Sequence, residues 1–170
     1  TVGPWISTPY FPATTNNLNQ IGFAVALRYV DLIKESIVAG RADGLFKFIG
    51  DTYERLRSIA SCASIPFLGF DLSISPWMEE SVAEIIELLI ENRIGYPGTV
   101  NAIVALNRMI RLIASKAAVP VIGFNEVMLP VAEDSLLNER VRTGVIRLRD
   151  LVNYSAFCVA GLDMVSIPIK

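Results

Sequence analysis

Short unbroken runs of apolar residues alternate along this chain with longer stretches in which apolar residues recur every three or four positions. The unbroken runs are typical of strands buried on both faces. They fall at residues 21–27, 65–72, 119–124 and 162–167. The periodic stretches predict amphipathic helices at about 31–38, 43–63, 76–89, 99–117, 133–142 and 148–157. Strands of this kind separated by helices predict an α/β fold with parallel strands and right-handed connections.

Residues with strong positional preferences mark three of the predicted helix starts. Ser75 is expected to cap the third helix, with Pro76 at its first position. A turn at 95–98 precedes Thr99, which is expected to cap the fourth helix. The adjacent acids Glu133 and Asp134 suit the start of the fifth helix, because acidic groups are favourable near the positive end of a helix dipole.

The chain divides into an arm and one domain. Residues 1–20 are rich in Pro, Thr and Asn, which predicts an irregular N-terminal arm. Residues 21–170 hold all the predicted strands and helices, and their number suits a single α/β domain. The chain begins at Thr1 without Met and ends at Lys170 directly after an apolar run. We therefore expect a processed piece or fragment of a longer protein.

Composition narrows the class of protein. Hydrophobic residues make up 52% and charged residues 19%, which excludes a disordered chain. A membrane span needs about 20 unbroken apolar residues, and Glu87 interrupts the best candidate run at 85–90. The net charge of −2 provides no basic field for nucleic acid. We expect neither a membrane nor a nucleic-acid partner. Two cysteines without CxxC spacing predict a reducing cytoplasm.

The sequence contains no histidine, which excludes Ser-His-Asp triads, Cys-His pairs and His-ligated zinc. Chemistry must then use other groups where strands end and helices begin, the usual place for sites in parallel α/β folds. Asp71 and Ser73 follow the second predicted strand and share one face of an extended segment. They suit general-base chemistry or a hard cation. Alternatively, Asp71 and Ser75 satisfy loop amides and a helix start.

Two further segments are candidates by the same rule. The free amides at Gly98 and Thr99 suit a phosphate or carboxylate, although a plain turn with a helix cap is the favoured interpretation. Asn125 and Glu126 follow the third predicted strand, with Glu133 and Asp134 downstream. The acids could bind a divalent cation such as Mg²⁺ or Ca²⁺, but a helix start is again favoured for the 133–134 pair.

Five collinear blocks resemble motifs of one known family. They read YFPA with FAVAL at 10–13 and 23–27, DLSISP with ESVA at 71–76 and 80–83, GT with ALN at 98–99 and 105–107, LPVAED at 129–134, and CVAGLDM at 158–164. Together they resemble the uncharacterised bacterial and archaeal family known as domain of unknown function 711 (DUF711). The resemblance implies the α/β barrel of pyruvate formate-lyase and other glycyl-radical enzymes, in which two parallel half-sheets meet antiparallel. It implies no biochemical activity.

This chain departs from the family pattern in ways that limit what the resemblance implies. Family members are considerably longer, so the chain resembles the C-terminal half alone, a parallel half-sheet of the barrel. The other half would come from a companion chain, a missing segment or a second copy in a homo-oligomer. Bacterial members tend to have His in the glycine turn where this chain has Pro97, so no catalytic role is carried over. The segment 140–144 is only superficially similar to a glycyl-radical loop, and radical chemistry is not expected.

Two hypotheses of function follow. In the first, the chain is half of a barrel protein that binds a small anionic or metal-chelating ligand at the carboxyl ends of the strands. Asp71 and Glu126 are its candidate catalytic groups, and the candidate ligand contacts are Ser73, Gly98, Thr99 and Asn125. In the second, it is a structural or regulatory assembly subunit whose apolar excess serves subunit contacts. The sequence leaves open whether the protein is an enzyme.

Overall fold

The computed structural model describes residues 21–166, and the arm expected at 1–20 lies outside them. The elements follow in the order β1 (Phe23–Ala26), α1 (Val30–Val38), α2 (Asp43–Ala63), β2 (Phe67–Asp71), α3 (Val82–Ile90), α4 (Thr99–Ala117), β3 (Met128–Pro130), α5 (Ser135–Arg142), α6 (Leu148–Tyr154) and β4 (Ala160–Asp163). Strands and helices therefore alternate much as the apolar pattern predicts.

The strands form two parallel pairs. β1 pairs with β2, with Ala26 opposite Asp71, and β3 pairs with β4. Hydrogen bonds beyond the strands join the two pairs, since the chain leading into β3 runs beside β2 and its continuation. The Phe70 amide donates to the Pro120 carbonyl at 2.9 Å, and the Ile74 amide donates to the Glu126 carbonyl at 3.1 Å. Four parallel rows thus lie in the spatial order β1, β2, the segment 120–130 and β4 within the described residues.

The third predicted strand is misplaced. Of residues 119–124, only Val121 forms a β-bridge, with Phe70, and the strand itself lies at Met128–Pro130. The chain leaves the ladder between these positions because Gly123 and Asn125 adopt left-handed conformations, with φ of 92° and 55°. The last strand, expected at 162–167, is also misplaced, but in the opposite direction, since it lies earlier in the chain, at Ala160–Asp163.

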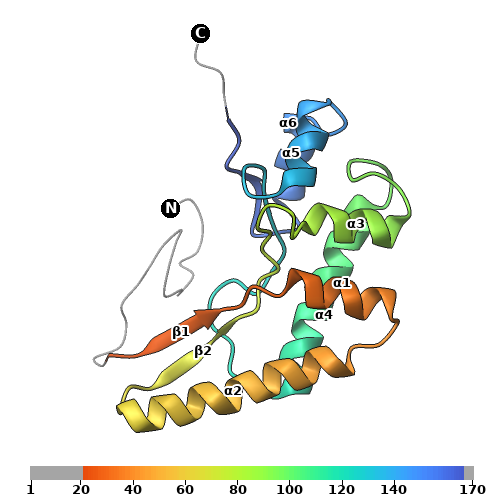
Figure 1. Ribbon diagram of the computed structural model, residues 1–170. Helices are drawn as coiled ribbons and strands as arrows, with labels where there is room; N and C mark the ends of the chain where they lie inside the picture. Colours follow the sequence, from red (N-terminus) through yellow and green to blue (C-terminus); the bar gives the residue numbers. More distant parts are fainter. Residues whose placement is uncertain (1–20, 167–170) are drawn as a thin grey trace.

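The core lies between the strands and the helices. Phe70, Leu72 and Ile74 are fully buried, and by strand alternation Asp71 and Ser73 point to the opposite face. Helix α4 packs against α2 and α3, as Figure 1 shows. Its buried face carries Ile103, Leu106, Ile110 and Ile113.

Two helices begin differently from the sequence-based prediction. Helix α3 starts at Val82, not at Pro76, because Ser81 caps it by accepting the Glu84 amide at 3.0 Å. Helix α4 has Gly98 as its N-cap, with φ of 105°, whereas Thr99 is already helical. A side chain at position 98 would be strained in that backbone conformation and would press on Ile90, 3.2 Å from an added Cβ.

The described residues confirm a mixed α/β fold. Across 21–166 neither parallel pair closes into a barrel (Figure 1). Within that same part of the chain, the helices are too short or too polar to cross a membrane.

Candidate functional site

Asp71 is buried and gathers a dense set of hydrogen bonds at the end of β2. One carboxylate oxygen, Oδ1, accepts from the Ser73 amide at 2.8 Å, the Ser73 hydroxyl at 2.5 Å and the Asn125 amide at 3.2 Å. The other, Oδ2, accepts from the Phe124 amide at 3.0 Å. Asp71 therefore joins the exit of β2 to the bulge at 123–126, and these donors compensate for the loss of water around its charge.

Asn125 holds the same bulge from the other side. Its side-chain oxygen accepts the Leu72 amide at 2.9 Å, and its amide nitrogen donates to the Ile122 carbonyl at 3.4 Å. Its left-handed backbone is a conformation in which Asn is enriched. The bulge is thus fixed by bonds from both Asp71 and Asn125.

Glu126 directly follows Asn125 in the chain. Its amide donates to the Ser73 hydroxyl at 3.3 Å, so Ser73 links Glu126 to Asp71. The Glu126 carboxylate has no hydrogen bond or ion pair to another of residues 21–166. Its partial burial raises the pKa of the carboxyl, and the charge of Arg111 on α4 opposes that rise. The fixed loop backbone therefore carries a carboxyl group that holds its proton more strongly than an exposed glutamate.

The structure brings four of the predicted site residues together and places two elsewhere. Asp71, Ser73, Asn125 and Glu126 form one cluster. Gly98 and Thr99 instead line a pocket of about 360 Å³ between the 95–101 segment and helix α6. The Thr99 hydroxyl accepts the Gly95 amide at 2.9 Å and donates to the Tyr96 carbonyl at 2.8 Å, so it stabilises the turn.

The acids at 133 and 134 lie at helix starts. Asp134 is fully buried and is the N-cap of α5, where Oδ1 accepts the Leu137 amide at 3.0 Å. Oδ1 also accepts the Ser81 hydroxyl at 2.6 Å, and Oδ2 accepts the Ala83 amide of α3 at 3.0 Å. Among the described residues, no three His, Cys, Asp or Glu side chains gather in a way that could hold a metal ion. A bound divalent cation stays a prediction.

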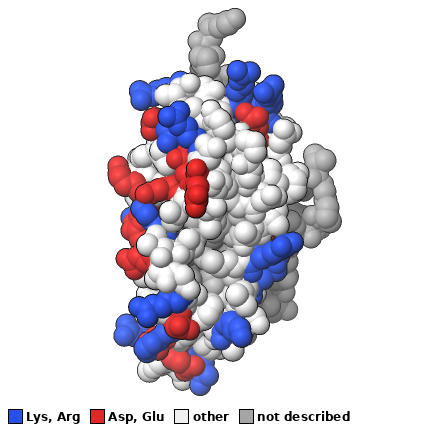
Figure 2. Space-filling model, turned by 90° about the vertical axis from the view of Figure 1, so that its right-hand side faces the viewer, with Lys and Arg blue, Asp and Glu red and all other residues white. Residues whose placement is uncertain are grey.

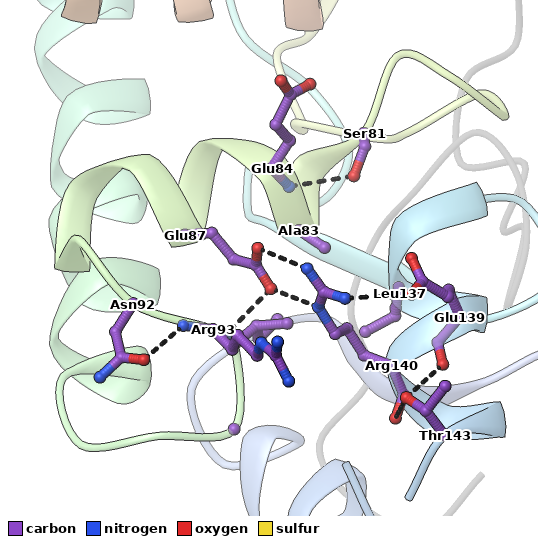
Figure 3. Close-up of polar contacts among 12 residues, drawn as sticks. Ser81, Ala83, Glu84, Glu87, Asn92, Arg93, Leu137, Glu139, Arg140 and Thr143 are labelled. Atoms are coloured by element: carbon purple, nitrogen blue, oxygen red, sulfur yellow. Dashed lines mark hydrogen bonds and ion pairs between the residues drawn. The ribbon is translucent and has the colours of Figure 1, made fainter. Parts of the chain in front are cut away.

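Sequence reasoning missed a partly buried ion pair between α3 and α5, drawn in Figure 3. Arg140 donates through Nε and Nη2 to the two oxygens of Glu87, at 2.7 and 3.0 Å, and the Ile94 amide donates to Oε1 at 3.1 Å (Figure 3). Burial works to raise the pKa of Glu87, but Arg140 and the amide outweigh it and lower the pKa. The Arg140 side chain is mostly buried, and the sequence signal for its partner is an acid, Glu87, inside an apolar run.

A second missed group lies at the exit of β1. Arg28 forms an ion pair with Glu80 through two of its nitrogens, with Nε 2.8 Å from Oε2. Its guanidinium carbon lies 5.9 Å from the ring centroid of Trp77. The Leu27 amide donates to the Asp71 carbonyl at 3.3 Å, so Arg28 directly follows a residue bonded to the cluster.

The fold and the strand-end cluster define a mixed α/β protein with polar groups at the exits of its parallel strands. The chain belongs to the family described as Uncharacterised ACR (DUF711), which it matches over residues 6–170. It is 32% identical to a UPF0210 protein of Lactobacillus helveticus, over 82% of this chain and 31% of the relative. It is 33% identical to a UPF0210 protein of Pyrobaculum arsenaticum, over 94% of this chain and 39% of the relative. The chain thus spans less than half the length of these relatives, and no solved structure matches it.

Proposed function

We propose that this chain binds a small anionic ligand at the carboxyl ends of its strands and that Glu126 is the acid–base group of the site. The observation that carries the proposal is the contrast between Asp71 and Glu126. The two carboxylate oxygens of Asp71 accept hydrogen bonds from four donors and so fix the loop. Glu126 stands on that fixed loop with its carboxylate uncommitted among the described residues.

The two carboxylates then have different roles. A carboxyl group with a raised pKa can give or take a proton nearer to neutral pH, which suits a general acid or base. Asp71 is a positioning residue, because its oxygens already accept hydrogen bonds from Ser73, Phe124 and Asn125. Ser73 connects Asp71 to Glu126, because its hydroxyl accepts a hydrogen bond from the Glu126 backbone amide.

We further propose that the chain is a half-barrel, the C-terminal half of a pyruvate-formate-lyase-like barrel. Four rows that all run in one direction support a parallel half-sheet. The partial coverage of the longer relatives supports a missing half, which a companion chain, a further segment or a second copy would supply.

One observation favours the second candidate, an assembly subunit. Helices α3 and α4 expose Leu88, Leu89 and Leu112, each more than a third accessible. Figure 2 shows a broad area without charged side chains on the side of the molecule where α3 lies in Figure 1. Such surfaces mark contacts with other chains. The mass in solution tests self-assembly, since a monomer at all protein concentrations would exclude a homo-oligomer.

The ligand proposal is tested by the effect of pH on anion binding. The probe is sulfate, whose charge is constant between about pH 5 and pH 8, and the readout is the rise in melting temperature against chloride at equal ionic strength. Ionisation of Glu126 repels an anion, so the sulfate shift should fall as the pH rises in the parent protein. It should be independent of pH in Glu126→Gln.

The matched control is Glu35→Gln, which removes an exposed acid of α1. This variant should keep the parent's pH dependence. Absence of any sulfate shift in the parent protein, or a pH dependence that survives in Glu126→Gln, would contradict the proposal.

A further inference from the structure

An anionic ligand at this cluster needs a cation, because the cluster itself is acidic. Asp71 and Glu126 carry its ionisable groups. Within the described residues, the segments that follow β1, β2, β3 and β4 contain a single basic side chain, Arg28, while Arg111, whose charge acts on Glu126, lies on α4. It is two residues beyond β1, the strand that pairs with β2 at Asp71.

The guanidinium of Arg28 is held in place on one edge. Glu80 accepts from Nε and Nη2, and the Trp77 ring lies beside the guanidinium at 5.9 Å. An arginine that is already paired and stacked has lost much of its side-chain conformational entropy. Binding a ligand therefore costs little additional entropy.

The other edge of the guanidinium is available. An arginine has five N–H donors in a planar fork, and Glu80 engages the Nε side of it. The donors of Nη1 have no hydrogen-bond partner among residues 21–166, and the Arg28 side chain is 57% exposed. The edge formed by Nη1 and Nη2 matches the two oxygens of a carboxylate, sulfate or phosphate group.

We propose that Arg28 binds the anionic group of the ligand at this end of the sheet, through the guanidinium edge that Glu80 leaves open. This inference rests on the proposed function and names the group that anchors the ligand. Trp77 and Glu80 orient the arginine, and Glu126 meets the part of the ligand that exchanges a proton.

Trp77 provides a local probe for the test. The sequence has two tryptophans, so a Trp5→Phe background leaves Trp77 as the only one. Its ring is half exposed and lies beside Arg28, so its fluorescence should respond when an anion reaches the guanidinium. Titrations use sulfate and, separately, acetate at one pH, with chloride at equal ionic strength as the blank, so that the tetrahedral and planar anions are distinguished.

We expect a saturable fluorescence change in the Trp5→Phe protein and an apparent affinity at least about tenfold weaker in Arg28→Met. Arg28→Lys keeps the charge but loses the fork, so it should fall between the two. The control is Arg57→Met on α2, which removes an exposed arginine that also pairs with a glutamate, Glu54 at 3.7 Å. It should leave the titration unchanged.

The outcomes separate this inference from the proposed function. If the Trp5→Phe protein binds and Arg28→Met binds equally well, Arg28 is not the anchor, while the Glu126 proposal stands. If neither anion gives a saturable change while sulfate still raises the melting temperature, the Arg28 inference fails alone, and if that rise is absent as well, both proposals fail. If Arg28→Met loses its far-ultraviolet helical signal, Arg28→Lys decides, because an unchanged affinity in that variant would overturn the requirement for a fork.

Discussion

Asp71 and Asp134 are both buried, and both accept backbone amides from segments about 50 residues away in sequence. They differ in what those amides belong to. Asp134 accepts hydrogen bonds from amides in the first turns of two regular helices, α3 and α5. Asp71 accepts hydrogen bonds from amides of an irregular bulge, which do not take part in strand pairing.

The difference separates a carboxylate that stabilises the fold from one that arranges a site. Helix starts need capping wherever they occur, because their first amides have no partner within the helix. A bulge needs fixing only if its shape matters, and this bulge ends in Glu126. A buried acid at a strand exit is therefore not by itself the reactive group. Here the neighbour that it positions is the better candidate.

The largest effect expected from this comparison is on stability, at Asp134. Asp134→Ala removes the acceptor for Leu137, Ala83 and the Ser81 hydroxyl at once. We expect the free energy of unfolding to fall by about 3 kcal/mol, measured by urea denaturation. The sulfate response of the remaining folded protein should be unchanged. A lost sulfate response in a folded Asp134→Ala protein would contradict the assigned division of roles.

Compared with Asp134→Ala, Asp71→Asn should lower the free energy of unfolding less and reduce the sulfate response more. The side-chain NH₂ of the new asparagine would face the Phe124 N–H. Two donors would then point at each other, and the bulge would lose this hydrogen bond. We expect a loss of about 2 kcal/mol in the free energy of unfolding, together with loss of the pH-dependent sulfate shift. The same urea and melting measurements check both. A retained sulfate shift would show that the loop geometry does not depend on Asp71.

The comparison also shows which features could be predicted from sequence. Helix α2 was predicted to the residue, because its apolar stripe is a local property of 21 consecutive positions. The gathering of Asp71, Ser73, Asn125 and Glu126 was expected, but the reason was wrong for Asn125 and Glu126, which precede β3 and do not follow a strand. The bulge was missed, because its Phe124 and Asn125 amides donate to a carboxylate more than 50 residues away in the chain. The pairing of Arg28 with Glu80 is equally non-local.

The smallest expected effect concerns the stability that Glu126 itself contributes. Its pKa is raised in the folded state, so folding favours the protonated form, and stability from this group is lost as the pH rises above the unfolded value. Glu126→Gln should therefore be slightly more stable than the parent at neutral pH, by less than about 1 kcal/mol because the group is partly exposed. The difference should vanish below about pH 3, where the carboxyl is protonated in both states. Urea titrations across this range measure it, with Asp134→Asn as the contrasting variant, which should lose stability at neutral pH. A Glu126→Gln protein less stable than the parent at neutral pH would mean that the carboxylate has a stabilising partner, and the contrast with Asp71 would no longer hold.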